Sequence, residues 1–158
     1  MDVVVGIGEY AVSADPDDVL VTYSLGSCLG LAVYDARTGA AALLHAQMPV
    51  SKADPDRALR APGTYVDTGV AAVLSELFAL GASRSTLVVR VAGAGSSFSA
   101  DDPFRIGERN HTVLRRVLWK NGILIASEDV GGPDSRTLSL EVGSGRAFVK
   151  ARSETREL

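Results

Sequence analysis

The chain has 158 residues, 46% of them hydrophobic and 22% charged, which gives a single globular domain enough apolar material for a core. The net charge of −3 is spread along the chain, and nothing in the sequence resembles the basic stripe of a nucleic-acid-binding protein, so we expect no nucleic-acid partner. One cysteine excludes an internal disulfide and any zinc site with two thiolates, and the two histidines lack metal-ligand spacing, so we expect neither metal nor cofactor.

The N-terminus and the hydropathy pattern predict the compartment. The first residues lack the basic segment and the long apolar run of a signal peptide. No apolar stretch approaches the roughly 20 residues that a membrane-spanning helix requires. We therefore expect no membrane insertion, and a reducing cytoplasm in which the lone thiol stays free.

The first 63 residues predict short strands and loops. Apolar, β-branched runs predict strands at residues 3–5, 19–23, 29–35 and 40–47, with a turn at 36–39 that ends on Gly39. The stretch 51–63 is polar and contains Pro55 and Pro62, which predicts a loop.

The remainder predicts two amphipathic helices among further strands. Apolar residues at steps of three and four predict helices from Thr64 to a cap at Gly81 and from 107 to 120, with Trp119 in the core. Strands are predicted at 86–91 and 123–126, and a hairpin at 137–142 and 146–150. Residues 93–99 form a loop rich in glycine and serine, and the polar residues from Ala151 on are expected to fray.

These elements predict an α+β fold. The strands follow one another as hairpins and do not alternate strictly with helices, which favours mostly antiparallel sheets covered by two helices. We assign residues 1–150 to one domain and residues 151–158 to a polar C-terminal tail.

Cys28 is the first candidate for chemistry. A lone cysteine is most often a small buried hydrophobe. Here Gly26 and Gly30 flank it, with Ser27 alongside, and small residues let a substrate approach the sulfur and leave a backbone N–H free for an oxyanion. The pattern is similar to the nucleophile elbow of α/β-hydrolases, but a strand follows the cysteine instead of a helix, so we reject that fold.

His45 is the second candidate because the predicted hairpin places it near Cys28. If the turn is 36–39, Asp35 pairs with Ala40, and Cys28 then lies opposite Gln47. His45 would lie diagonal to Cys28 on the same face, at roughly 7–8 Å between backbones. An imidazole at this position can take the proton of a thiol whose pKa is near 8.5, producing a nucleophile for an amide carbonyl.

A third polar group is expected to orient the imidazole. Thr22 and Ser24 on the preceding strand are the better candidates, and Asp35 and Gln47 are weaker ones. The other motifs do not predict a catalytic or cofactor-binding site. The glycines at 6–8 and 93–95 lack the remaining residues of nucleotide-binding loops, and the polar cluster 106–110 predicts helix capping and surface ion pairs.

Several segments together resemble the CheD family of chemoreceptor glutamine deamidases. They are Leu25-Gly26-Ser27-Cys28, His45-Ala46-Gln47-Met48-Pro49, Ile106-Gly107-Glu108-Arg109-Asn110, Glu128-Asp129-Val130-Gly131-Gly132 with Arg136, and Gly145-Arg146-Ala147-Phe148-Val149-Lys150. The resemblance covers the chain from about Val3 to Lys150.

The resemblance implies a three-layer α/β/β sandwich and hydrolysis of receptor glutamines to glutamates through a cysteine thioester. Cys28 and His45 match the family's catalytic cysteine and histidine, and Thr22 matches its polar third residue, which favours Thr22 over Ser24. The implied substrate is the helical cytoplasmic domain of chemoreceptors, and a CheC-type phosphatase is an implied partner. The alternative is a non-catalytic module that docks to a CheC-type phosphatase or to a receptor.

Overall fold

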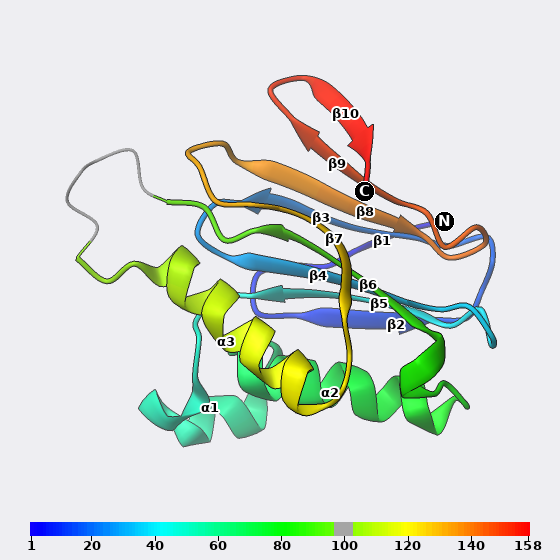
Figure 1. The fold of residues 1–158 in the computed structure, drawn as a ribbon, viewed down its shortest axis with the longest axis horizontal. Coiled ribbons are helices and arrows are strands. Elements are labelled where there is room, and N and C mark those ends of the chain that lie inside the picture. Colours follow the sequence, from blue (N-terminus) through cyan, green and yellow to red (C-terminus); the bar gives the residue numbers. More distant parts are fainter. Residues whose placement is uncertain (97–102) are drawn as a thin grey trace.

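The computed structural model describes residues 1–96 and 103–158 (Figure 1). The first half holds β1 (Asp2–Val4), β2 (Tyr10–Ser13), β3 (Val19–Leu25), β4 (Leu29–Asp35), β5 (Ala41–Ala46), α1 (Pro55–Arg60) and α2 (Val66–Ala79). The second half holds β6 (Leu87–Gly93), α3 (Ile106–Lys120), β7 (Ile125–Val130), β8 (Arg136–Glu141), β9 (Ala147–Ala151) and β10 (Glu154–Glu157). Three 3-10 turns lie at Ser51–Ala53, Pro62–Thr64 and Arg84–Thr86.

The described strands form two five-stranded sheets. The outer sheet has the order β1-β3-β8-β9-β10, and the inner sheet has the order β2-β5-β4-β6-β7. Six of the eight pairings between described strands are antiparallel, whereas β1–β3 and β6–β7 are parallel. Helices α2 and α3 cover the face of the inner sheet that points away from the outer one (Figure 1). The expected α+β sandwich of three layers is thereby confirmed.

The inner sheet is apolar on both faces because it separates two cores. Leu29, Leu31 and Val33 pack towards the helices. The alternate residue Ala32 packs with Leu43 and the outer sheet. This alternation explains why β4 is a nearly continuous apolar run in the sequence.

The first half departs from expectation in two places. The predicted loop at 51–63 contains α1, because Asp54 caps the helix by accepting a hydrogen bond from the Arg57 N–H and Pro55 occupies its first turn. Strand β2 was not predicted. It is four residues long, half-buried along its length, and pairs with β5 at the edge of the inner sheet.

The second half shows three further differences. Trp119 is not in the core: its side chain is 78% exposed. Most of the residues expected to fray form β10, which pairs antiparallel with β9, and Glu157 of β10 also forms an ion pair of 2.7 Å with Arg146, the residue before β9. Strands β6 and β7 run parallel, with α3 as the crossover helix. Part of the predicted 93–99 loop lies outside the described residues.

Candidate active site

Cys28 lies where the chain crosses from the outer sheet to the inner sheet. Strand β3 belongs to the outer sheet and ends at Leu25, and β4 of the inner sheet begins at Leu29. The intervening turn leaves Cys28 half-buried against the core between the sheets. The position gives the thiol both a protected side, on which a base can lie, and an open side for a substrate.

The predicted register between β4 and β5 is confirmed. The N–H of Asp35 donates to the carbonyl of Ala40, and Gly30 pairs with His45. Continuing this register one residue beyond β4 places Cys28 opposite Gln47, with His45 diagonal to it. His45 and Cys28 both face the space between the two sheets. Gly30 must lack a side chain there, because a Cβ would lie 2.7 Å from Leu25 Cδ1.

Thr22 joins the two sheets through His45. Its Oγ1 lies 2.7 Å from His45 Nδ1 and donates to the carbonyl of Val5, also at 2.7 Å. A threonine hydroxyl has one proton, and a carbonyl can only accept. The proton between Thr22 and His45 therefore belongs to Nδ1, so Nε2 carries the lone pair of the neutral ring.

The Nε2 atom of His45 is buried and has no hydrogen-bond partner among the described residues. Burial lowers the pKa of His45 below its usual 6.5. Burial also raises the pKa of the Cys28 thiol, partly offset by its own backbone N–H. Both groups are therefore uncharged at rest near neutral pH, and the imidazole is in the form that accepts a proton.

Asn110 of α3 links two segments of the site. One is the turn at residues 26–28, which we call the nucleophile turn, and the other is the residue that follows β5, the strand of His45. The Nδ2 atom of Asn110 donates to the carbonyl of Ser27 at 3.0 Å and to the carbonyl of Gln47 at 3.2 Å. The side chain is fully buried, and its Oδ1 has no hydrogen-bond partner in the described part of the chain. One side chain thus fixes the residue before Cys28 and the second residue after His45.

Backbone hydrogen bonds hold the remaining carbonyls of the turn. The Gly26 carbonyl accepts from the N–H of Gly95 at 2.8 Å, and the Cys28 carbonyl accepts from Ala94 at 2.7 Å. In a trans peptide the N–H points opposite to the preceding carbonyl. Because the carbonyls of Gly26 and Ser27 are bound, the N–H groups of Ser27 and Cys28 point away from those bonds.

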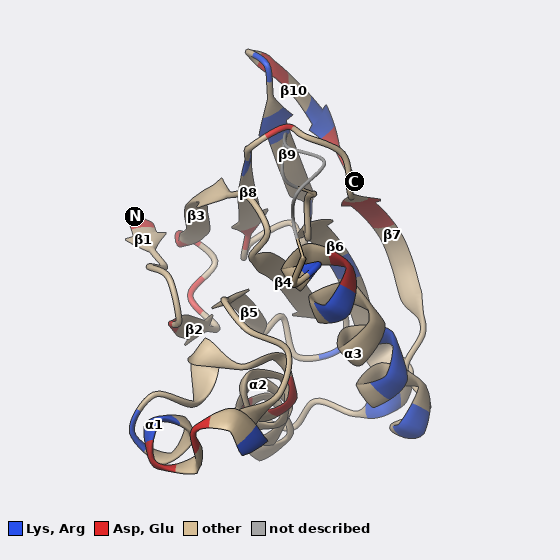
Figure 2. Cartoon of the chain, turned by 90° about the vertical axis from the view of Figure 1, so that its left-hand side faces the viewer, with Lys and Arg blue, Asp and Glu red and all other residues tan. Residues whose placement is uncertain are grey.

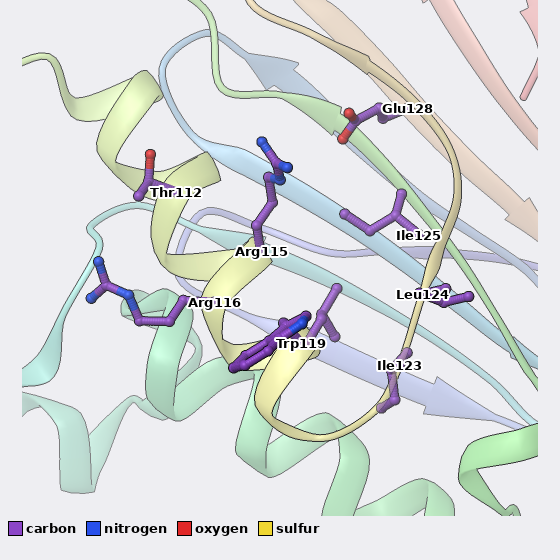
Figure 3. A pocket seen from close by; sticks show the side chains of 9 residues that line it. Thr112, Arg115, Arg116, Trp119, Ile123, Leu124, Ile125 and Glu128 are labelled. Carbon is purple, nitrogen blue, oxygen red and sulfur yellow. The ribbon is translucent and has the colours of Figure 1, made fainter.

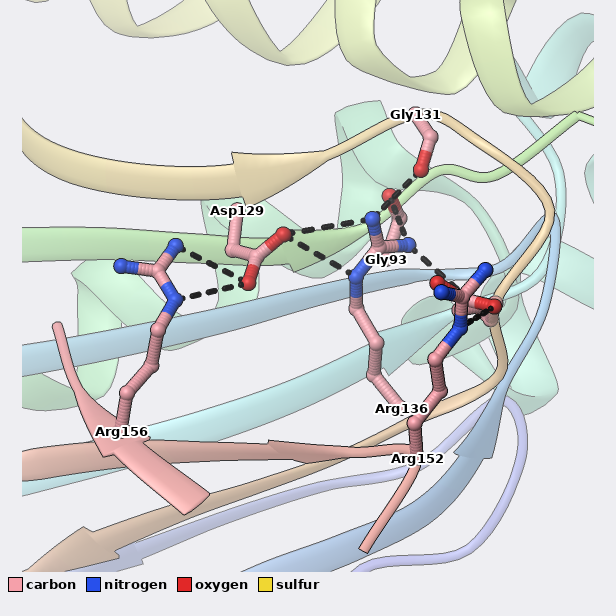
Figure 4. A network of polar contacts seen from close by, with 7 residues as sticks. Gly93, Asp129, Gly131, Arg136, Arg152 and Arg156 are labelled. Carbon is pink, nitrogen blue, oxygen red and sulfur yellow. Dashed lines mark hydrogen bonds and ion pairs between the residues drawn. The ribbon is translucent and has the colours of Figure 1, made fainter. Parts of the chain in front are cut away.

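Arg136, the first residue of β8, supports this arrangement from the outer sheet (Figure 4). It forms an ion pair of 3.2 Å with Asp129 and donates to the carbonyls of Gly93 and Gly131. Gly93 itself contacts the nucleophile turn so closely that a Cβ would lie 2.5 Å from the Cys28 carbonyl oxygen. Arg136 therefore fixes the β6 end on which the turn rests.

The other polar residues considered for orienting His45 are placed elsewhere. Ser24 is exposed, with a φ of 59°. Asp35 lies at the far end of β4, where it accepts hydrogen bonds from Thr38 and Thr86. The side chain of Gln47 lies 3.5 Å from Arg57. Of the candidates, Thr22 alone bonds to the imidazole among the described contacts of His45.

Sequence reasoning missed the role of Asn110. The cluster 106–110 was expected to cap the helix and form surface ion pairs, and the Arg105–Glu108 pair at 4.0 Å is of that kind. Asn110, however, shares the buried face of α3 with Gly107, Leu114 and Leu118. A polar residue at a core position of an amphipathic helix is a signal for a buried partner, and that signal was present in the spacing.

The described residues contain neither a candidate metal site nor a candidate membrane-spanning helix. No group of three or more histidine, cysteine, aspartate or glutamate side chains there could hold a metal ion. None of the described helices is long and apolar enough to span a membrane.

Known proteins resemble this chain over nearly its whole length. A family model described as CheD chemotactic sensory transduction matches residues 47–151. A relative from Solibacter usitatus is 40% identical over 156 residues, covering 99% of this chain and 92% of the relative. One from Anaeromyxobacter dehalogenans is 42% identical, covering 99% and 98%, and one from Pyrococcus horikoshii is 37% identical, covering 97% and 94%. All three are described as probable chemoreceptor glutamine deamidases CheD. The chain belongs to the CheD family.

Proposed function

We propose that this protein is a chemoreceptor glutamine deamidase in which Cys28 is the nucleophile, His45 the base and Thr22 the residue that orients His45. The observation that carries the proposal is the Thr22–His45 hydrogen bond, which leaves Nε2 of a neutral, buried imidazole as a free acceptor on the face of Cys28. The names of the CheD relatives support glutamine on a chemoreceptor as the substrate.

Acylation begins with proton transfer. His45 Nε2 takes the proton of the Cys28 thiol as the sulfur attacks the carbonyl carbon of the glutamine side chain, forming the C–S bond. The imidazolium then gives this proton to the amide nitrogen. The C–N bond breaks, ammonia leaves, and a thioester joins Cys28 to the substrate.

Deacylation repeats the cycle with water. His45 takes a proton from water, whose oxygen attacks the thioester carbonyl. The C–S bond breaks, the proton returns to the sulfur, and glutamate is released. The hydrogen bond to Thr22 keeps His45 in one tautomer through both halves of the reaction, so the same nitrogen serves as base and as acid.

The nucleophile turn supplies the donors for the negative charge on the attacked carbonyl. The N–H groups of Ser27 and Cys28 are turned away from the bonds that hold the preceding carbonyls. Donors fixed in this way stabilise an oxyanion without reorganising during the reaction. Asn110 and Gly95 thereby contribute by holding the turn.

The proposed setting is the cytoplasm, where chemoreceptors expose their helical signalling domains. A free thiol is compatible with a reducing compartment. The sequence resemblance supports a CheC-type phosphatase as a second partner.

The test is incubation with a soluble cytoplasmic receptor fragment, followed by peptide mass analysis. Wild-type protein is expected to convert particular glutamines to glutamates, and Cys28→Ala to convert none while unfolding at the same denaturant concentration. Cys28→Ser is the matched variant, since it replaces the thiol with a hydroxyl and keeps the shape of the side chain. Receptor modification that survives in Cys28→Ala would contradict the assigned nucleophile, and absence of modification by the wild type would contradict the deamidase.

A further inference from the structure

Helix α3 concentrates basic side chains on its exposed face, which differs from the expectation that charges are spread evenly along the chain. Five exposed cations and one exposed acid lie along it, although the chain as a whole has a net charge of −3 (Figure 2): Arg105, Arg109, Arg115, Arg116 and Lys120 against Glu108. Arg105 lies 4.0 Å from Glu108. In the described structure no carboxylate forms an ion pair with Arg109, Arg115, Arg116 or Lys120. These four cations are thus left without an ion-pair partner in the described part of the chain.

Large apolar side chains stand beside these charges. Trp119 is 78% exposed and Leu124, in the loop before β7, is 85% exposed. They flank a hollow of about 600 Å³ between α3 and β7, into which Arg115 projects (Figure 3). The hollow's carboxylate, Glu128, is already hydrogen-bonded to His111 at 2.8 Å. An exposed tryptophan next to uncompensated arginines is the composition of a protein-binding hot spot.

A second hollow adjoins the first and extends to the segment that follows β5, the strand of His45. It has a volume of about 400 Å³ and lies between Pro49, Val50 and α3, where Thr112 and Arg116 line both hollows. Pro49 lies two residues after Gln47, whose carbonyl accepts a hydrogen bond from Asn110, as does the carbonyl of Ser27. The surface therefore begins at the segment that carries His45 and continues along α3 to Trp119.

The spacing of the cations indicates the shape of the partner. Arg109, Arg116 and Lys120 are separated by seven and four residues, so they follow one side of a helix over about 16 Å. A partner helix with carboxylates at three- and four-residue steps can lie along this row and place an apolar side chain beside Trp119. A flexible acidic segment would have to lose more conformational entropy to make the same contacts.

We infer that the exposed face of α3 is a docking surface for an acidic, amphipathic helix of a protein partner, and that this helix flanks the glutamine delivered to Cys28. This inference rests on the proposed deamidase function, because only that function makes the docked partner the substrate. Nucleic acid fits less well, because the net negative charge of the chain would repel a polyanion outside this one helix.

The experiment combines kinetics with binding on a soluble cytoplasmic chemoreceptor fragment. Arg115→Glu/Arg116→Glu and Trp119→Ala are compared with wild type, and Arg115→Gln/Arg116→Gln serves as a second variant that adds no acid near the C-terminal end of α3. Arg37→Glu/Lys150→Glu is the matched control, since it reverses two exposed cations on other elements. The docking variants should raise KM about tenfold or more and leave kcat unchanged.

Binding is measured separately in the Cys28→Ala background, so that failure of catalysis and failure of docking can be told apart. Loss of fragment affinity in the docking variants, stronger at low salt than at high salt, would support the surface even if the wild type deamidated nothing. Unchanged KM and affinity, with iodoacetamide labelling of Cys28 also unchanged, would overturn it. The inference would also be overturned if Arg115 and Arg116 were needed for binding single-stranded DNA or anionic lipid vesicles but not for binding the receptor fragment.

Discussion

The hydroxyl of Thr22, on the outer sheet, lies 2.7 Å from Nδ1 of His45, on the inner sheet. This contact crosses the core between the two sheets, so the orientation of the imidazole depends on how the sheets pack. The carbonyl of Val5 takes the threonine proton, which fixes the direction of the bond to histidine. The strand that precedes Cys28 in the chain, which belongs to the opposite sheet, thus determines which nitrogen of His45 is left to accept a proton.

Thr22→Val is expected to lower kcat about 100-fold with little change in KM. The substitution keeps the shape of the side chain but removes the acceptor for Nδ1–H, so the imidazole loses both its preferred tautomer and its orientation. Receptor deamidation measured by peptide mass gives the rate. Thr22→Ser should restore most of the activity, and Ser24→Ala, at an exposed position, should not change it. A fully active Thr22→Val protein would show that His45 needs no orienting residue.

His45 should make the fold less stable as the pH falls below 6.5. In the unfolded chain the ring titrates near 6.5, whereas burial lowers its pKa in the folded state. Between these pKa values the unfolded chain holds a proton that the folded chain does not, so the free energy of unfolding falls with decreasing pH. Urea unfolding between about pH 8 and pH 5 should show a weaker pH dependence for His45→Gln than for wild type.

The second histidine provides the control for this experiment. His111 is hydrogen-bonded to Glu128 at 2.8 Å on a partly exposed surface. His111→Gln should therefore keep the part of the pH dependence that His45→Gln loses. If the two variants behave alike, burial of His45 is not the cause.

Asn110→Ala is expected to reduce both stability and turnover. It removes the donor for the carbonyls of Ser27 and Gln47, and each unsatisfied buried group costs about 1–3 kcal/mol. The nucleophile turn would also lose its link to the strand of the base, which should lower kcat more than it raises KM. Asn121→Ala removes a single bond to Val117 at the end of the same helix and is the control. Equal turnover in the two variants would argue against a positioning role.

Local patterns predicted most of the elements and the register near the site. The turn at 36–39 has a fixed length, so it determined how β4 pairs with β5 and hence that His45 lies diagonal to Cys28. The contact of Thr22 was not predictable from spacing, because β3 belongs to the other sheet. The same holds for Asn110, whose partner Ser27 lies 83 residues earlier in the chain.

The errors have related causes. Trp119 was expected in the core, yet it follows the buried Leu118 and so lies about 100° around the helix from it. The C-terminal residues were expected to fray because they are mostly polar. Three of their charged side chains instead form ion pairs with residues earlier in the chain: Arg152 with Asp134, Arg156 with Asp129 and Glu157 with Arg146. Hydropathy alone does not contain that information.

Gly93→Ala should destabilise the protein more than Gly122→Ala does. Both glycines have a positive φ, 93° and 68°, so both substitutions incur roughly 1–2 kcal/mol of backbone strain. A Cβ at Gly93 would additionally lie 2.5 Å from the Cys28 carbonyl oxygen, whereas one at Gly122 would meet open space. Urea unfolding gives the difference, and receptor deamidation should be reduced only in Gly93→Ala. Equal effects would mean that the turn can move away without cost.

Arg136→Ala and Arg156→Ala remove two cations from the same carboxylate, Asp129, with different expected outcomes (Figure 4). The Arg136 side chain is 7% exposed, and its loss leaves the Gly93 carbonyl without that buried donor while Asp129 keeps Arg156, which should cost about 1–3 kcal/mol. Arg156 is 61% exposed, so its pair is screened by water and its loss should cost less than about 1 kcal/mol.

A third variant, Arg136→Lys, separates the effect of the positive charge from the effect of the hydrogen-bond geometry of Arg136. Arg136→Lys keeps the charge but cannot reach Asp129 and two carbonyls at once, so it should recover only part of the stability that Arg136→Ala loses. Because Gly93 contacts the nucleophile turn, receptor deamidation should fall with Arg136 and not with Arg156. Equal losses of unfolding free energy in the two alanine variants would show that the buried bonds of Arg136 add nothing to its ion pair. Full activity in Arg136→Ala would show that the turn at Cys28 is held without them.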